Sequence, residues 1–232
     1  MADVDAFGTI VTQGGGIIPL YNAAQTEGAE EELLTDSTLV GSAQTCGTFA
    51  SQSMRSQRMV MAGFTSEKHV GYCFIRSAGL IKCAFPFSGK NSGHNLPARL
   101  PYPKTLVSGD QAIMKAEASS TRQVALSVAC SNGEYHVFES AVIGAAKDNH
   151  VMLSILTGLS IGETLQGRTV THAFATLGDN SSQMISPIYF VNGSGVPIGS
   201  VIADNPATDT CTYQSCVVPI ALNTRLLFRT DA

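Results

Sequence analysis

Tryptophan is absent from this chain of 232 residues, and charged residues make up only 14% of it. Average soluble domains carry roughly 25% charged residues. Serine, threonine, alanine and 22 glycines fill the shortfall. A surface of small uncharged residues suits close contact with other protein, because few ions have to be desolvated there. The same composition also fits an ordinary β-domain, and composition alone does not separate the two interpretations.

Positive charge is scarce as well. No lysine or arginine precedes Arg55, and the net charge is −4. Because proteins hold phosphate backbones mainly through clustered cations, we expect no strong nucleic-acid binding. No run of 18 apolar residues predicts a transmembrane segment. The first twenty residues lack the basic region and the cleavage site of a secretion signal, so we expect none.

Motifs that would hold a metal, a phosphate or a cofactor are missing. The five histidines show no His-x-His or His-x-x-x-His spacing, and there is no Cys-x-x-Cys. Gly14-Gly15-Gly16 lacks the Lys-Ser/Thr that completes a phosphate-binding loop. We therefore expect no catalytic residues, no cofactor and no metal site.

A serine in a glycine-rich segment raises one enzymatic alternative. Gly193-Ser194-Gly195, with His69 upstream, is superficially similar to chymotrypsin-like proteases. Those enzymes share a Gly-Asp-Ser-Gly-Gly loop and an Ala-Ala-His-Cys strand end, and this chain has neither. A glycine-rich hairpin turn explains Ser194 without catalysis.

The six cysteines do not predict a disulfide framework, because a chain of this length does not need one and shows no export signal. Buried free cysteine behaves as a small hydrophobe. Cys73 and Cys83 form the one pair that strand pairing would place face to face, and a bond between them stays open. Cys211 and Cys216 are five residues apart and point to opposite faces of a regular strand.

Short strand-like segments separated by glycine-bearing turns run from Met54 to the C-terminus. The clearest turn is Ser131-Asn132-Gly133. Asn-Gly is the preferred pair of a two-residue type I′ hairpin loop, because both residues need positive φ. With that loop, Cys130 opposes Tyr135 and one face of the hairpin collects the apolar residues. These residues are Val124, Leu126, Val128, Cys130, Tyr135, Val137 and Ala141.

Two further hairpins are expected. The first covers His69 to Phe85, with a three-residue loop Ser77-Ala78-Gly79 that sets Cys73 opposite Cys83. The second covers Ile188 to Ile202, with Pro197 on an edge strand because proline cannot donate to the ladder. Additional strands are predicted at Met54–Phe64, Gln111–Ala118, His150–Leu156, Thr169–Thr176, Cys211–Ile220 and Thr224–Thr230. This pattern predicts an all-β fold, an antiparallel β-sandwich of the jelly-roll type.

The first forty residues differ in character. Two short apolar strands flank the glycine break, and Asn22 to Leu34 is compatible with one or two helical turns. We expect an N-terminal arm or docking segment over residues 1–40 and a single β-sandwich domain over residues 41–232. The segment docks on its own sheet, the simpler arrangement, or crosses to a neighbouring copy. Its apolar contact residues are Phe7, Ile10, Ile17, Ile18 and Leu20.

Fold class, low charge and the missing site motifs together favour a self-assembling structural protein. The general type is similar to the single jelly-roll coat proteins of icosahedral viruses, a similarity of class and size. It implies a capsid, coat or virion surface subunit that is made in the host cytoplasm. Its partners would be copies of itself and other shell proteins. Without a basic arm, such a subunit encloses its genome in another way or lies outside an inner layer or membrane.

Two other classes of function remain open. A ligand-binding β-module would recognise a glycan or a protein partner, although the absence of tryptophan weakens stacking on sugars. A chymotrypsin-like hydrolase comes third, on the basis of Ser194 in its glycine-rich segment and the upstream His69.

Overall fold

The computed structural model describes residues 4–15, 17–25, 29–35, 58–66, 71–85, 87–88, 98–107, 109–116, 124–141, 150–177, 187–204 and 212–229. Within these residues the chain forms eighteen β-strands and one short helix, so the all-β prediction is confirmed. Two sheets of nine strands each account for all of the strands.

The first sheet is built from residues 4 to 116. Its strands are β1 Val4–Thr12, β2 Ile17–Gln25, β3 Glu30–Thr35, β4 Arg58–Ser66, β5 Gly71–Ser77, β6 Leu80–Phe85, β7 Phe87–Ser88, β8 Ala98–Thr105 and β9 Gln111–Ala116. They lie in the order β6-β5-β9-β3-β2-β1-β4-β7, and β8 also pairs with β4. All pairings are antiparallel except the short one between β4 and β7.

The second sheet is built from residues 124 to 228. Its strands are β10 Val124–Cys130, β11 Tyr135–Ser140, β12 His150–Ser154, β13 Thr169–Leu177, β14 Ile188–Val191, β15 Pro197–Val201, β16 Ala203–Asp204, β17 Gln214–Pro219 and β18 Arg225–Phe228. The helix α1, Ile161–Leu165, connects β12 to β13. It is the one helix among the described residues, and its five residues are far too few to cross a bilayer.

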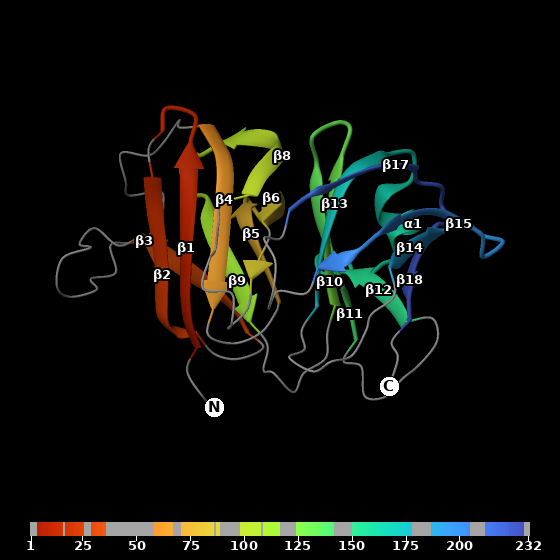
Figure 1. Ribbon diagram of the computed structural model, residues 1–232, viewed down its shortest axis with the longest axis horizontal. Coiled ribbons are helices and arrows are strands. Elements are labelled where there is room, and N and C mark those ends of the chain that lie inside the picture. The colour runs from red at the N-terminus through yellow and green to blue at the C-terminus, as the bar shows by residue number, and fades with distance from the viewer. Residues whose placement is uncertain are drawn as a thin grey trace.

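Both sheets have the same topology. The second lies in the order β15-β14-β18-β12-β11-β10-β13-β16, with β17 also paired to β13, which is the first order with nine added to every strand number. Figure 1 shows the two units side by side. The approach of β6 to β8, and of β15 to β17, brings each sheet close to closing on itself. We call β1–β9 the first half and β10–β18 the second half.

The agreement extends to the register of individual residues. Val11 pairs with Ile17 as Ala129 pairs with Tyr135, at an offset of 118 residues in both strands. The pairing of β1 with β4 shifts between Val11 and Thr12, and the pairing of β10 with β13 shifts at the equivalent step after Ala129. The chain therefore contains one nine-stranded unit twice.

The N-terminal residues belong to the first sheet, where β1 lies between β2 and β4. Ile10, Ile18 and Leu20 are buried in its core, so this segment docks on its own sheet. The helical turns expected over Asn22 to Leu34 are wrong, because strand pairing overrides local helix propensity there and gives the end of β2 and most of β3. The boundary expected at residue 40 lies outside the described residues, and strand pairing instead groups residues 4–116 and 124–228.

The hairpin at Asn132-Gly133 exists, but the predicted type I′ loop is wrong. The N–H of Cys130 donates to the Glu134 carbonyl at 2.9 Å, and the N–H of Gly133 donates to the Cys130 carbonyl at 2.8 Å. Only Gly133 has a positive φ, +84°, so the loop has three residues and ends in a glycine bulge. Ala129 therefore opposes Tyr135, one residue from the predicted partner.

This shift of one residue moves half of the hairpin to the other face. Tyr135 and Val137 share a face with Ala125 and Ala129, and the opposite face carries Val128. All seven residues of β10 are buried, so both faces of this hairpin are covered. The predicted single apolar face is thus wrong for Tyr135 and Val137.

The hairpin of β5 and β6 has a shorter loop than predicted, with two residues instead of three. Ala78 and Gly79 both have positive φ, and Ser77 pairs with Leu80, which makes a two-residue type I′ loop. A bulge after Ile75 then restores the predicted faces, but Cys83 lies opposite Ile75 and not opposite Cys73.

The remaining strand predictions agree with the structure. The hairpin of β14 and β15 is present, and β15 with Pro197 is an edge strand. The six additional predicted strands overlap β4, β9, β12, β13, β17 and β18. The strand order does not confirm the jelly roll.

Replacing Gly133 by valine tests the loop. Valine at φ +84° is strained, and the added Cβ would meet its nearest neighbour at an ordinary 3.5 Å, so the cost is conformational. We expect Gly133→Val to lower the free energy of unfolding by about 1–3 kcal/mol. Gly14→Val is the matched control, because Gly14 lies in a hairpin loop with open space around it and without positive φ. Equal denaturation curves for the two variants would contradict the assigned loop.

The cysteines provide a second test. Cys73, Cys83 and Cys130 are buried, Cys216 is half-buried, and all four are free; Cys46 and Cys211 lie outside the described residues. Burial raises the pKa of Cys130 and of Cys216 to about 11, which suppresses the reactive thiolate. We expect a thiol reagent to label at most three cysteines quickly in the native protein and all six after denaturation. Rapid native labelling of Cys73 or Cys83, located by mass spectrometry, would overturn the assignment of these thiols to the core.

Candidate functional site

The surface on which the two halves meet is the most extensive feature that the sequence did not predict. Strands β5 and β6 of the first half lie against β10 and β11 of the second (Figure 1). The side chains at its centre form one continuous hydrophobic cluster and are all at least 95% buried. They are Phe74 and Ala84 from the first half, and Ala125, Ala129, Tyr135 and Val137 from the second. We call this surface the junction.

Each half contributes to the junction the face that points away from its own interior. On β5, Phe74 alternates with Cys73 and Ile75, which belong to the interior face. On β10, Ala125 and Ala129 alternate with Val128, which packs in the interior cluster of the second half. Small residues at these positions let the two sheets approach closely. The junction is therefore a sheet-on-sheet contact that extends the core of the first half into the second.

Tyr135 supplies the polar anchor of the junction. Its hydroxyl donates to the Tyr102 carbonyl at 3.0 Å and accepts from the Tyr102 N–H at 2.9 Å. Burial raises the pKa of Tyr135, so the hydroxyl stays protonated and able to donate. Tyr213 packs edge-on against the Tyr135 ring and donates its own hydroxyl to the Ala84 carbonyl at 2.9 Å. Hydrogen bonding of both hydroxyls removes the penalty of burying these polar groups.

Polar contacts surround this apolar centre. Lys115 of β9 forms an ion pair with Glu139 of β11 at 3.0 Å, and the hydroxyls of Tyr102 and Thr171 lie 2.8 Å apart. An apolar centre with a polar rim is the usual arrangement of a protein–protein interface. In this chain the same arrangement joins two parts of one polypeptide.

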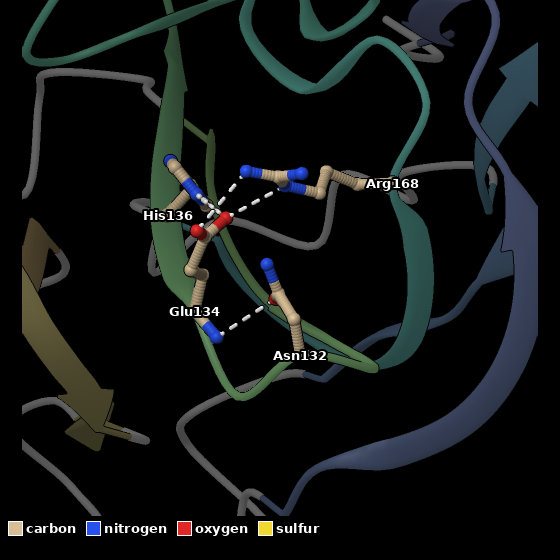
Figure 2. A network of polar contacts seen from close by, with 4 residues as sticks. All are labelled: Asn132, Glu134, His136 and Arg168. Atoms are coloured by element: carbon tan, nitrogen blue, oxygen red, sulfur yellow. Dashed lines mark hydrogen bonds and ion pairs between the residues drawn. The ribbon is translucent and has the colours of Figure 1, made fainter.

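A pocket of 420 Å³ opens at one end of the junction, between the β5–β6 turn and the second half. Its polar wall is shown in Figure 2. Arg168 donates from Nε and Nη2 to the two carboxylate oxygens of Glu134, at 3.0 and 3.2 Å. The Asn132 amide oxygen accepts the N–H of Glu134 at 3.1 Å, which fixes the turn that carries the carboxylate.

The two opposite charges in this pocket, on Glu134 and Arg168, are paired with each other. Hydrogen bonds from the side chains of Asn132 and Arg168 lower the pKa of Glu134. Burial lowers the pKa of His136, whose Nε2 lies 3.8 Å from Glu134, too far for a hydrogen bond. Near pH 7 the network therefore holds a paired carboxylate and guanidinium beside a neutral imidazole. Both ion-pair partners are close to half exposed, so the pair adds little stability.

A larger pocket of 620 Å³ lies along β11 and β12. Its polar groups have structural partners. Glu139 is the carboxylate paired with Lys115, and the Ser140 hydroxyl accepts the N–H of Val124. The Ser154 hydroxyl accepts two backbone N–H groups of the following turn. The pocket thus shows no polar group arranged for a reaction among its described residues.

The residues considered for catalysis from the sequence do not come together. His136, His150 and His172 lie on three different strands, and His69 lies outside the described residues. Among the described residues, no group of three histidine, cysteine, aspartate or glutamate side chains could hold a metal ion. Ser194 is an exposed turn residue whose N–H donates to the Asn192 side chain at 3.0 Å. Asn192 and the following glycine turn account for its position.

Sequence reasoning missed the junction and the helix α1. The helix begins at Ser160, which forms a reciprocal capping box with Glu163, and the Ser-x-x-Glu pattern would have predicted this start. No local pattern could have found Tyr135 and Tyr102, which are 33 residues apart. The Arg168–Glu134 pair is likewise separated by 34 residues.

The neutral His136 predicts a pH dependence of stability. A lowered pKa in the folded state means that the unfolded chain takes up the proton first as the pH falls below about 6.5, so acidification from about pH 7.5 to 5.5 destabilises the fold. Glu134, whose pKa is also lowered, loses its contribution only below about 4.5, outside this window. Arg168 stays charged throughout.

The matched variant is His136→Ile, because the equivalent position of the first half carries the buried Ile18. We expect its melting temperature to fall less than that of the parent between about pH 7.5 and 5.5, measured by calorimetry. His172, whose pKa is also lowered by burial, contributes equally to both proteins. Parallel pH profiles would contradict a neutral His136 in the folded protein.

Comparison with protein-family models, with curated proteins and with solved structures finds no match for this chain. The comparison that the structure itself offers is between its two halves.

Proposed function

We propose that this chain is a self-assembling structural subunit, and within that class a virion coat or surface component. The observation that carries the proposal is the repetition of one nine-stranded topology, joined by a junction whose centre is uncharged and well buried. Tandem units that already pack on each other through sheet faces are suited to covering a surface. The low charge of the chain supports the same conclusion, because few charged groups have to lose their water when its surface is buried, so the free-energy cost of desolvation is small.

The junction supports assembly in a specific way. It joins β5 and β6 of one unit to β10 and β11 of the next, which are not equivalent strands in the shared topology. A contact between non-equivalent surfaces of like units is heterologous, and such contacts extend into rings or filaments. A contact between equivalent surfaces would instead close a pair.

The virion assignment draws on composition. A coat subunit with a jelly-roll-like sandwich and no lysine or arginine among the residues before Arg55 fits a shell whose genome contacts come from other components. In this proposal the chain does no chemistry, and its partners are copies of itself and other shell proteins.

One observation favours the second candidate, a ligand-binding β-module. The 420 Å³ pocket at the end of the junction lies within the usual range for small ligands, about 300–1,000 Å³. Against this, Arg168 and Glu134 already neutralise each other there. A ligand would have to compete with that pair.

Light scattering on the purified full-length protein separates the two functions. We expect particles well above the monomer mass of 24.3 kDa at micromolar concentration. Their mass should not change between about 0.05 and 1 M salt, because apolar contacts are not weakened by screening as ion pairs are. A monomer at every concentration and salt level would rule out the structural function and leave the binding module.

A further inference from the structure

Because the junction joins two different surfaces of like units, each half keeps one of these two surfaces that finds no partner surface within the chain. In the shared topology, β14 and β15 of the second half are equivalent to β5 and β6, and β1 and β2 of the first half are equivalent to β10 and β11. The chain uses the β5–β6 face and the β10–β11 face to join its halves. The equivalent faces, β14–β15 at one end and β1–β2 at the other, remain.

The β14–β15 face matches the β5–β6 face residue by residue. Phe74 pairs with Ala84, and the equivalent pair is Tyr189 with Ser200. The bulge after Ile75 recurs after Phe190, which fixes the equivalence.

Exposure differs between these equivalent positions. Phe74 and Ala84 are 1% and 0% exposed in the junction, whereas Tyr189 is half-buried and Ser200 is exposed. Ile198, on the bulge of β15, is 38% exposed. The β14–β15 face is therefore an uncharged surface with aromatic, aliphatic and hydroxyl side chains that the second half leaves open to solvent.

The β1–β2 face matches the β10–β11 face in the same way. Thr9 and Val11 occupy the positions of Ser127 and Ala129, and both are only partly buried, whereas Ser127 and Ala129 are buried in the junction. None of the six register positions of this face carries a charge. They are Phe7, Thr9 and Val11 on β1 and Ile17, Pro19 and Tyr21 on β2.

The apolar N-terminal residues that were expected to contact a neighbouring copy fall into two groups, one in the core and one at the β1–β2 face. Ile10, Ile18 and Leu20 are buried in the core of the first half and cannot serve that purpose. Phe7 and Ile17 lie at register positions of the opposite face, the one equivalent to the second half's junction surface.

We propose that the β14–β15 face of one copy packs on the β1–β2 face of a second copy, which repeats between chains the contact that joins the halves within a chain. This inference rests on the proposed function and names its partner as another copy of the same chain. The contact is again heterologous, so it closes into a ring where the rotation per copy permits and otherwise extends as a filament.

Point substitutions on the two faces test this contact. Deleting residues 1–21 would remove β1 and more than half of β2 from the first sheet, so it cannot separate assembly from folding. Ser200→Glu places a charge at the position equivalent to the fully buried Ala84, and Thr9→Glu does so at the position equivalent to Ser127. Val151→Glu is the control, because Val151 is 47% exposed on β12 and the equivalent residue of the first half is Glu32.

The expected results follow from heterologous pairing. In light scattering, Ser200→Glu and Thr9→Glu should each give monomers of 24.3 kDa, whereas Val151→Glu should assemble like the parent. Each variant keeps one intact face, and these faces are complementary. An equimolar mixture of the two variants should therefore form a dimer of twice the monomer mass and nothing larger. Thermal melts confirm that each variant is folded, and Thr9→Lys replaces Thr9→Glu if the latter is not, since a long side chain can carry its charge to solvent.

The outcomes separate this inference from the proposed function. If the parent assembles and either face variant assembles equally well, a different surface joins the copies and this inference fails while the structural function stands. If both variants are monomers but their mixture gives no dimer, the two faces do not pair with each other and the inference fails as well. A parent that stays monomeric at all concentrations overturns the structural function and this contact together.

Discussion

Burial of both faces of the β10–β11 hairpin is the constraint on which the arrangement of the molecule depends. One face carries Val128 and fills the interior of the second half, and the other carries Tyr135 and Val137 and covers the first half. Fully burying side chains of this size contributes roughly 1.5–3 kcal/mol each, so the second buried face is a large part of what holds the halves together. The Tyr135 hydroxyl makes this burial tolerable, because the Tyr102 backbone satisfies it from the other half. Without these contacts the described halves would be held together mainly by polar contacts such as those of Tyr102 with Thr171 and of Tyr213 with Ala84.

The sequence located the strands well and the relation between them poorly. Alternation of side chains predicted β10, β11, β5 and β6, because that pattern is local. Loop length was not determined by the turn residues, since Asn-Gly occurs both in two-residue loops and, as here, in a three-residue loop that ends in a glycine bulge. The resulting error of one residue concealed the second buried face, and with it the junction. The repetition of topology was equally hidden, because equivalent positions keep their place in the strand pairing and not their residue type, as Ile18 and His136 show. Nothing local could predict the Glu134–Arg168 pair either, because the fold brings together residues that lie 34 positions apart.

In two equivalent turns, a side-chain oxygen accepts a backbone N–H, but the two halves use different residue types for it. The turn before β9 is closed by the buried Asp110, whose carboxylate accepts the N–H of Val107 at 2.9 Å. In the turn before β18 the buried Thr224 hydroxyl accepts the N–H of Ala221 at 3.0 Å. A buried carboxylate needs a countercharge, which Lys82 on the bulge of β6 supplies, whereas a hydroxyl needs none. The position equivalent to Lys82 is Ile198. Loss of the buried charge in the second half thus accompanies an apolar residue on the bulge of β15, where the bulge of β6 carries a lysine.

The proposed contact between copies would differ from the junction in strength, although both use equivalent strands. The junction is supported by the Tyr135 hydroxyl and by the Lys115–Glu139 ion pair, and the equivalent positions of Tyr135 and Glu139 are Ile17 and Tyr21. A contact that lacks this anchor and this ion pair should be weaker than the junction, and without an ion pair it should be insensitive to salt. The two halves of one chain also meet at the high effective concentration that a covalent connection provides, whereas two copies meet only at their solution concentration. Tandem repetition therefore makes one contact of the series permanent and leaves the next reversible, an arrangement in which subunits fold first and assemble when their concentration rises.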